Sequence, residues 1–209
     1  MVWMFSLANA EDVLHEDWSD YELGDSIVSS GKWKMYDGAD SQVIISEEGG
    51  VRVFSANYKG DDAVSLPYVG LAEALEMGHG VMMEITFQKT EERYIRVGFA
   101  NLNGKIVGEM YYLDFQNSYA QFFKGTTEHA RLHYTEKGFH PPVGDFATIT
   151  LEIQPQEEGR LKFRVLQDGW VYLEWVDDNA YFFTEGVVPF IAFRDPAQGW
   201  FSSIHIKRI

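Results

Sequence analysis

The sequence predicts an all-β fold, a two-sheet antiparallel sandwich or a barrel, and three observations lead to this class. Short strand-like runs recur along the chain, with turn residues about every 8–12 positions. Helical periodicity is confined to 70–77, so helices do not alternate with the strands, which excludes a parallel α/β fold. No repeat of fixed period is present, which disfavours a propeller or a β-helix.

The individual elements follow from turns and alternation. The runs 43–45 and 51–54 flank a Glu-Glu-Gly-Gly segment and predict a hairpin with a glycine turn. Asp168-Gly169 lies between two alternating runs and is the strongest two-residue hairpin signal, and Asn103-Gly104 is a second turn of this kind. The segment GLAEALEM at 70–77 predicts a helix of about two turns. The remaining predicted strands are 81–87, 94–100, 105–115, 119–124, 130–134, 147–153, 161–166, 171–176, 187–193 and 201–209.

Composition excludes several classes of function. Hydrophobic residues make up 45% of the 209 residues and aromatic residues 15%, which is enough for a core and argues against disorder. Lys and Arg number 17 against 32 Asp and Glu, and a net charge of −15 disfavours nucleic acid and anionic membranes as partners. Cysteine is absent, which excludes disulfides, thiol catalysis and Cys-based zinc sites. No apolar run approaches the roughly 20 residues that span a bilayer.

We expect a single domain over 11–209, because the chain has no Pro/Ser linker and no low-complexity stretch. The preceding segment 1–10 is apolar and ends in Ala8-Asn9-Ala10 before an acidic start. Small residues in this spacing resemble a signal-peptidase site. Two interpretations stay open: a signal-peptide remnant, which makes the protein extracytoplasmic (periplasmic or secreted), or a short apolar arm that packs on the domain.

An acidic-aromatic segment opens the body of the chain, an early hairpin follows, and a strand–turn element and two strands close it. The segments are 16–20 (EDWSD), 33–38 (WKMYDG), 43–45 with 50–53, 161–169, and 187–193 followed by 201–206. This arrangement resembles the concanavalin A-like lectin/glucanase superfamily over most of 14–209. The resemblance implies a jelly roll of two curved antiparallel sheets whose concave face receives sugars. It also implies that 16–20 belongs to the first strand and that 187–193 and 201–206 are the closing strand pair. It leaves function open, because the superfamily contains lectins, carbohydrate-binding modules, glycoside hydrolases, polysaccharide lyases and purely adhesive or structural modules.

Strand alternation predicts a polar surface suited to sugars. Side chains two apart share a sheet face, so polar stripes from neighbouring segments combine if they lie on one face. The stripes are Tyr112, Asp114 and Gln116; Tyr119 and Gln121; and His129, Arg131 and His133. Planar hydrogen-bonding groups mixed with aromatic rings suit sugar hydroxyls and ring faces, whereas the alternative is an ordinary solvated outer face. Two tryptophans join the set because each lies beside a turn. The predicted carbohydrate-binding residues are Arg96, Tyr112, Asp114, Gln116, Gln121, His129, Arg131, Trp170 and Trp200.

One enzymatic alternative is a β-eliminating lyase of uronate polysaccharides, which needs a base and a group that neutralises the uronate carboxylate. The resemblance implies that Tyr, His, Arg and Gln serve these roles in jelly-roll alginate lyases, and the segment 119–125 (YAQFFKG) is similar to their Tyr/Lys strand. Their Arg-x-Glu-x-Arg strand and Gln-hydrophobic-His triplet are absent. The lyase candidates are Arg96, Tyr119, Gln121, His129, Arg131 and His133.

A second enzymatic alternative is a retaining glycosidase, which requires two carboxylates about 5–5.5 Å apart. The resemblance implies a Glu-x-Asp-x-x-Glu strand, and the nearest segment is 174–178 (EWVDD). Alternation puts Glu174 and Asp178 on one face and Asp177 on the other, and the last Glu is missing. Surface carboxylates of an acidic protein are therefore the favoured interpretation.

Metal binding is predicted only as a structural calcium ion. Asp17 and Asp20 are the candidate ligands, together with backbone carbonyls, but calcium takes six to eight oxygens and the rest of the set is not evident. His129 and His133 lie in a predicted strand, where their spacing does not suit a shared zinc ion.

The sequence thus predicts a carbohydrate-recognising jelly-roll domain that binds an oligo- or polysaccharide on its concave face. The alternatives are a polysaccharide lyase, a glycoside hydrolase, and a structural or adhesion module with no sugar site. We expect no nucleic-acid partner and no membrane insertion, and the oligomeric state stays open.

Overall fold

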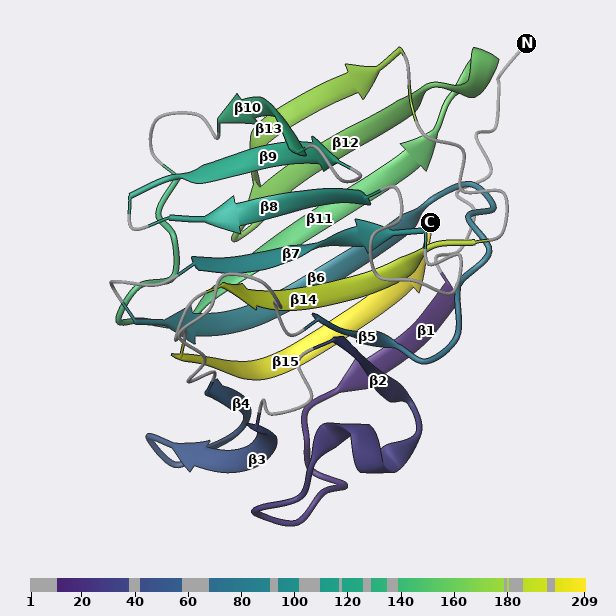
Figure 1. Ribbon diagram of the computed structural model, residues 1–209. Coiled ribbons are helices and arrows are strands. Elements are labelled where there is room, and N and C mark those ends of the chain that lie inside the picture. The colour runs from purple at the N-terminus through teal and green to yellow at the C-terminus, as the bar shows by residue number, and fades with distance from the viewer. Residues whose placement is uncertain are drawn as a thin grey trace, which may run out of the picture.

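The computed structural model describes residues 11–37, 42–57, 68–90, 94–101, 110–116, 118–125, 129–134, 139–178, 180, 186–194 and 198–209. Two antiparallel sheets lie face to face, with β7 to β10 of one sheet over β6 and β11 to β13 of the other (Figure 1). This arrangement confirms the predicted all-β sandwich.

Sheet A has the strand order β13-β12-β11-β6-β15-β4-β3, and β1 pairs with the far half of β15. Its strands are β1 (Glu11–Glu16), β3 (Gln42–Glu48), β4 (Val51–Asn57), β6 (Val81–Lys89), β11 (Ala147–Pro155), β12 (Leu161–Gln167), β13 (Trp170–Asp177) and β15 (Gln198–Arg208).

Sheet B has the strand order β10-β9-β8-β7-β14-β5-β2. Two short 3-10 helices, η1 (Ile27–Ser30) and η2 (Glu157–Gly159), lie outside both sheets. The strands of sheet B are β2 (Trp33–Asp37), β5 (Tyr68–Leu71), β7 (Tyr94–Ala100), β8 (Met110–Phe115), β9 (Ala120–Gly125), β10 (His129–Tyr134) and β14 (Val188–Arg194).

Both of the hairpin turns that fall on described residues are confirmed. Gly49 and Gly50 have φ values of 58° and 81° between β3 and β4. Asp168 and Gly169 have φ values of 50° and 83° between β12 and β13. Two successive residues with positive φ match the twist of the flanking strands, which is why Gly and Asp-Gly favour such turns. The predicted Asn103-Gly104 turn lies outside the described residues.

The predicted helix at 70–77 is wrong. Tyr68–Leu71 forms β5 instead, and Leu75 exchanges backbone hydrogen bonds with Val187, N to O, at 2.8 and 2.7 Å. A Cβ added to Gly70 would lie 2.9 Å from the Pro189 carbonyl oxygen, so β5 is pressed closely against β14. Pairing with β14 and burial of leucines from an extended backbone override a short helical pattern.

The two ends of the chain differ from the expected arrangement. The first strand ends at Glu16, and the expected segment 16–20 is a turn in which Trp18 has φ of 65° and its indole donates a 2.6 Å hydrogen bond to the Phe201 carbonyl. The last two strands, expected as a pair, lie in different sheets, β14 in sheet B and β15 in sheet A.

The main core lies between the sheets, and the two outer faces differ. Along β6 buried and half-buried side chains alternate, as expected for a strand with one solvated face. Along β8 every side chain is buried. A second apolar cluster accounts for this on the outer face of sheet B: Ala100, Met110, Tyr112, Phe190 and Ala192, with Phe123 packed against it. The centre of that face is therefore covered.

Candidate functional site

The β8–β9 hairpin carries four polar side chains on the outer face of sheet B, which we call the polar quartet: Asp114, Gln116, Tyr119 and Gln121. Asp114 is opposite Gln121 in the antiparallel register. The backbone N–H of Gln116 donates to the Tyr119 carbonyl at 2.9 Å, which makes these residues the next cross-strand pair. The alternation expected from sequence thus brings all four together, because one short turn sets the register of the hairpin.

Hydrogen bonds link the members of the quartet in pairs. The Gln116 Nε2 donates to Asp114 Oδ1 at 3.2 Å, and the Gln121 Nε2 donates to the Tyr119 hydroxyl at 3.2 Å. Asp114 is 1% exposed, whereas Tyr119 is 37% exposed and both glutamines are half-buried. Within the quartet the charge of Asp114 is therefore buried, whereas the two glutamines and Tyr119 reach solvent.

Arg96 on β7 lies beneath the quartet. Its Nε is 3.2 Å from Asp114 Oδ2, and its guanidinium lies 4.9 Å from the centre of the Tyr112 ring. The Tyr112 ring stacks on Phe123 at 5.1 Å with an interplanar angle of 11°. Arg96, Tyr112 and Phe123 thus form a row of planar groups across three neighbouring strands.

Burial at this row differs from the open sheet face that the sequence predicted. Arg96 is 6% exposed and Tyr112 is fully buried, together with Asp114. The row adjoins the second apolar cluster, which sequence alternation alone does not predict. Gly98 stands opposite Tyr112 in the register, and a Cβ there would lie 2.1 Å from the Tyr111 carbonyl oxygen. The strands approach so closely that only glycine fits.

The common face expected for His129, Arg131 and His133 stays a prediction. All three lie on β10 as predicted, but the register shifts between Arg131 and His133. Arg131 is opposite Phe123, whereas His133 is opposite Phe122, so the pairing of β10 with β9 has a bulge or irregularity at this point. The side chains of these three residues lie outside the described part of the structure.

The two predicted tryptophans lie on the other sheet. Trp170, at the start of β13, is 74% exposed, as expected for a residue beside the Asp168-Gly169 turn. Trp200 is only half-buried rather than exposed, and it pairs with Ser55 and Gln88 within sheet A. The prediction placed both tryptophans in one binding surface with the polar quartet. A linear sequence does not show which strands share a sheet, so this difference was not foreseeable.

The carboxylates considered for hydrolysis are held in ion pairs on sheet A. Glu174 contacts Lys162 at 3.0 Å and Arg164 at 3.3 Å. Asp178 lies 3.8 Å from Arg160. These contacts match the interpretation of both residues as surface carboxylates.

The Asp177 side chain points between the sheets. Successive side chains of β13 face opposite sides, and the preceding residue, Val176, faces solvent. Its Oδ2 accepts a 2.7 Å hydrogen bond from the Tyr111 hydroxyl and lies 2.8 Å from the Lys124 Nζ. Tyr111 and Lys124 belong to sheet B and Asp177 to sheet A. We call these three residues the cross-sheet clamp.

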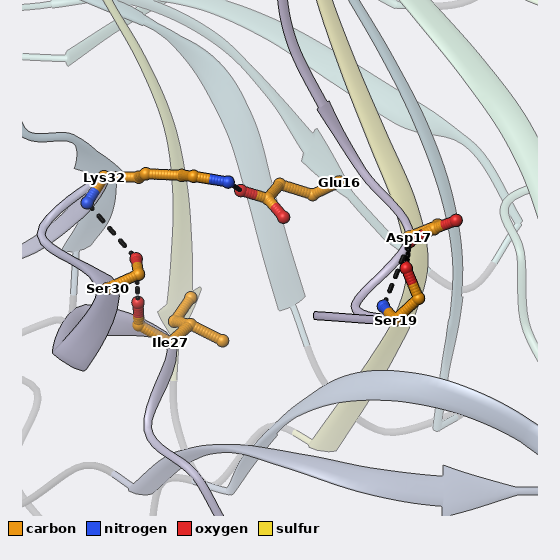
Figure 2. A network of polar contacts seen from close by, with 6 residues as sticks. All are labelled: Glu16, Asp17, Ser19, Ile27, Ser30 and Lys32. Carbon is orange, nitrogen blue, oxygen red and sulfur yellow. Dashed lines mark hydrogen bonds and ion pairs between the residues drawn. The ribbon is translucent and has the colours of Figure 1, made fainter. Parts of the chain in front are cut away.

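The predicted calcium ligands Asp17 and Asp20 both lie in the turn that follows β1. The Asp17 carboxylate accepts two hydrogen bonds from Ser19, at 3.0 Å from the backbone N and 2.6 Å from Oγ, and these bonds lower the pKa of Asp17 (Figure 2). Asp20 is exposed. Within the described residues no group of three or more His, Asp or Glu side chains could hold a metal ion. A calcium ion held by Asp17, Asp20 and backbone carbonyls stays a prediction.

A cavity of about 450 Å³ lies where β1, the start of β2 and the end of β5 meet. Val13, Leu14 and Leu71 contribute apolar walls, and Lys32 contributes a charge. The Lys32 Nζ contacts Glu16 Oε1 at 2.9 Å, which raises the pKa of Lys32 (Figure 2). The Ser30 hydroxyl donates to the Ile27 carbonyl at 2.9 Å. The ammonium group of Lys32 and the hydroxyl of Ser30 therefore each have a partner within the protein.

Comparison with known proteins bears on the fold. No family model and no curated protein matches the sequence. A solved structure reported with endo-acting O-glycanases that human gut bacteria express to initiate mucin breakdown aligns over 95% of this chain and 100% of its own, with a TM-score of 0.63 and 10% identity. The chain has a concanavalin A-like jelly-roll fold.

Other similar structures have different activities. The alginate lyase Aly36B, solved as a mutant with an alginate trisaccharide, aligns over 95% of this chain and 99% of its own, with a TM-score of 0.61 and 8% identity. The Emp46p carbohydrate recognition domain in its potassium-bound form aligns over 88% and 92%, with a TM-score of 0.57 and 13% identity. At such identities the likeness extends to the fold alone.

Within the described residues, no helix has the length and apolar character needed to span a membrane.

Proposed function

We propose that this chain is a carbohydrate-recognising jelly-roll domain that binds an oligo- or polysaccharide at the polar quartet. The observation that carries the proposal is the quartet itself: two amides, a phenol and a carboxylate in adjacent cross-strand pairs on one sheet face. Sugar hydroxyls both donate and accept hydrogen bonds, and planar amide and phenol groups match them. The ring of Tyr119 offers an exposed apolar surface for a sugar ring. The outer face of sheet B then corresponds to the concave face expected from the resemblance.

The burial and contacts of Arg96 favour a binding function without cleavage over a lyase activity. A uronate lyase needs a cation or equivalent group directed at the substrate carboxylate. Arg96 is instead buried against Asp114 and Tyr112. Release of that contact would take a close cationic partner from the buried carboxylate of Asp114, which is costly.

Binding is also favoured over a hydrolase by the number of carboxylates. Glycoside hydrolysis uses two carboxyl groups on either side of the scissile bond. Asp114 is the one carboxylate among the described side chains on the outer face of sheet B. Hydrolase and lyase activities of structural relatives with the same fold stay as alternatives, as does a module with no sugar site.

The proposal extends to the rest of the chain in two respects. Residues 11–209 act as one domain, and the protein works outside the cytoplasm. Support for the location comes from the Ala8-Asn9-Ala10 pattern that ends the apolar segment 1–10 and from structural relatives that act on mucin glycans and alginate.

Retardation in native gels that contain soluble polysaccharides tests the function. Wild type is compared with Gln121→Ala and with a matched control, Gln154→Ala, which removes a half-buried glutamine from sheet A. We expect retardation of wild type and the control, and loss of retardation in Gln121→Ala. A parallel time course of new reducing ends and of unsaturated uronate absorbance detects cleavage. If wild type formed product, the protein would be an enzyme and the proposal of binding alone would be wrong. If all three proteins were retarded equally, the binding site would not lie at the polar quartet.

A further inference from the structure

The amide of Gln116 has one favourable orientation. Its partner is the carboxylate of Asp114, and an ionised carboxylate accepts hydrogen bonds but cannot donate them. The NH₂ group of Gln116 must therefore face Asp114, as the 3.2 Å contact from Nε2 to Oδ1 has it. The Oε1 atom of Gln116 then points away from Asp114, on the half-buried side chain that reaches solvent.

Asp114 is itself held in place. Its second oxygen lies 3.2 Å from the Arg96 Nε, and the side chains of Asp114 and Arg96 are 2% and 7% exposed. A buried ion pair of this kind has little freedom to rotate, and its charge strengthens the hydrogen bond from Gln116. Two contacts in series, Arg96 to Asp114 and Asp114 to Gln116, thus connect a buried guanidinium to a side chain that reaches solvent.

Gln121 repeats the orientation on the neighbouring strand. Its Nε2 donates to the Tyr119 hydroxyl at 3.2 Å, and Gln121 lies directly opposite Asp114. Both glutamines thus direct an NH₂ group within the quartet and present Oε1 as an acceptor. Two amide acceptors suit O–H donors and repel a carboxylate, which carries only acceptors. The net charge of the protein, −15, also disfavours an anionic ligand.

We propose that Asp114 is a positioning residue that orients Gln116 toward the hydroxyls of a neutral glycan, while the charge of Arg96 is used inside the sheet to hold Asp114. The inference rests on the proposed function and deepens it in two ways. It names the ligand class as a neutral polysaccharide rather than a polyuronate, and it gives the buried Arg96–Asp114 pair a role in specificity.

The test measures retardation constants for wild type and Asp114→Asn on mixed-linkage β-glucan, galactan, mannan, alginate and polygalacturonate. The asparagine keeps the shape of Asp114 but has one oxygen, so either Arg96 or Gln116 meets an NH₂ group. We expect wild type to bind a neutral polysaccharide, and Asp114→Asn to lose about tenfold in affinity. The matched control is Glu152→Gln, which makes the same change in the 2.8 Å pair with Arg164 on sheet A and leaves affinity unchanged.

A second pair of variants separates positioning from general stability. Gln116→Glu replaces the donating NH₂ with an oxygen on a half-buried side chain, leaves the buried pair intact, and should cause the same loss. In a Gln116→Ala background Asp114→Asn should add little further loss, because Asp114 acts through Gln116.

Four outcomes would overturn the inference. Unchanged affinity in Asp114→Asn and Gln116→Glu, with wild type binding, would refute the positioning role alone. An equal loss from Asp114→Asn with and without Gln116 would reduce Asp114 to a structural residue. Retardation by alginate or polygalacturonate but by no neutral polysaccharide would refute the ligand class, and retardation by none of the five would remove the proposed function as well.

Discussion

The cross-sheet clamp of Tyr111, Lys124 and Asp177 should make a large contribution to stability. Lys124 is 13% exposed in its side chain and Asp177 7%, and their Nζ and Oδ2 atoms are 2.8 Å apart. The variant Asp177→Asn keeps the shape and an acceptor for Tyr111 but removes the charge opposite Lys124. Removal of one partner of a buried pair costs about 3–5 kcal/mol, because the other charge loses a close counter-charge at a position with little access to solvent.

The expected cost here is at the lower end, about 3 kcal/mol, because some solvent reaches the lysine. For a chain of this size that corresponds to a fall in Tm of roughly 6–12 °C. Urea and thermal unfolding followed by circular dichroism measure both quantities. Tyr111→Phe, which removes the 2.7 Å hydrogen bond alone, should cost about 1 kcal/mol.

A control and a double variant make the reasoning refutable. Glu174→Gln breaks ion pairs on the outer face of sheet A, where Glu174 is 51% exposed, and should cost less than about 1 kcal/mol. Lys124→Met combined with Asp177→Asn leaves no buried charge at the clamp and should be more stable than Asp177→Asn alone. If Asp177→Asn cost no more than Glu174→Gln, or if the double variant were the least stable, burial of the pair would not explain its contribution.

Three further predictions concern packing, pH and the site. Gly98→Ala should cost at least about 3 kcal/mol in urea unfolding, because its Cβ would meet the backbone of Tyr111 at 2.1 Å; near-wild-type stability would show that the strands can separate. The pKa of Lys32 is raised above 10.5 by Glu16, so its contribution is full below pH 10.5 and is lost as pH rises through the folded pKa. Wild type should therefore lose its stability advantage over Glu16→Gln at alkaline pH, and a constant difference up to pH 12 would contradict this. Trp170→Ala should change stability by less than about 0.5 kcal/mol and leave glycan retardation intact, since the indole is 74% exposed and belongs to the other sheet; reduced retardation would move the site to sheet A.

Local features of the chain were predictable from sequence. Asp168-Gly169 and Gly49-Gly50 form the expected hairpins, because positive φ at two successive residues is a property of the residues themselves. The shared face of the polar quartet was predictable for a related reason. A hairpin with a short turn has its register set by that turn, so alternation extends from one strand to the next.

Features that depend on distant segments were not predictable in the same way. The pattern at 70–77 is helical, but Gly70 packs closely against Pro189, more than a hundred residues away, and the backbone is extended. The register shift between Arg131 and His133 in the pairing of β10 with β9 has no signal in the sequence. The assignment of Trp200 to sheet A depends on the pairing of β15 with β4 and β6.

Local patterns in the chain are enough to predict the strand-rich class, two hairpin turns and the polar side chains of one hairpin, because each depends on conformational preferences within a few residues. Tertiary structure alone decided which strands share a sheet, which face is covered, and that Arg96 pairs with Asp114 beneath the quartet. Those outcomes depend on burial and on contacts between segments far apart in the chain, and no local pattern encodes them.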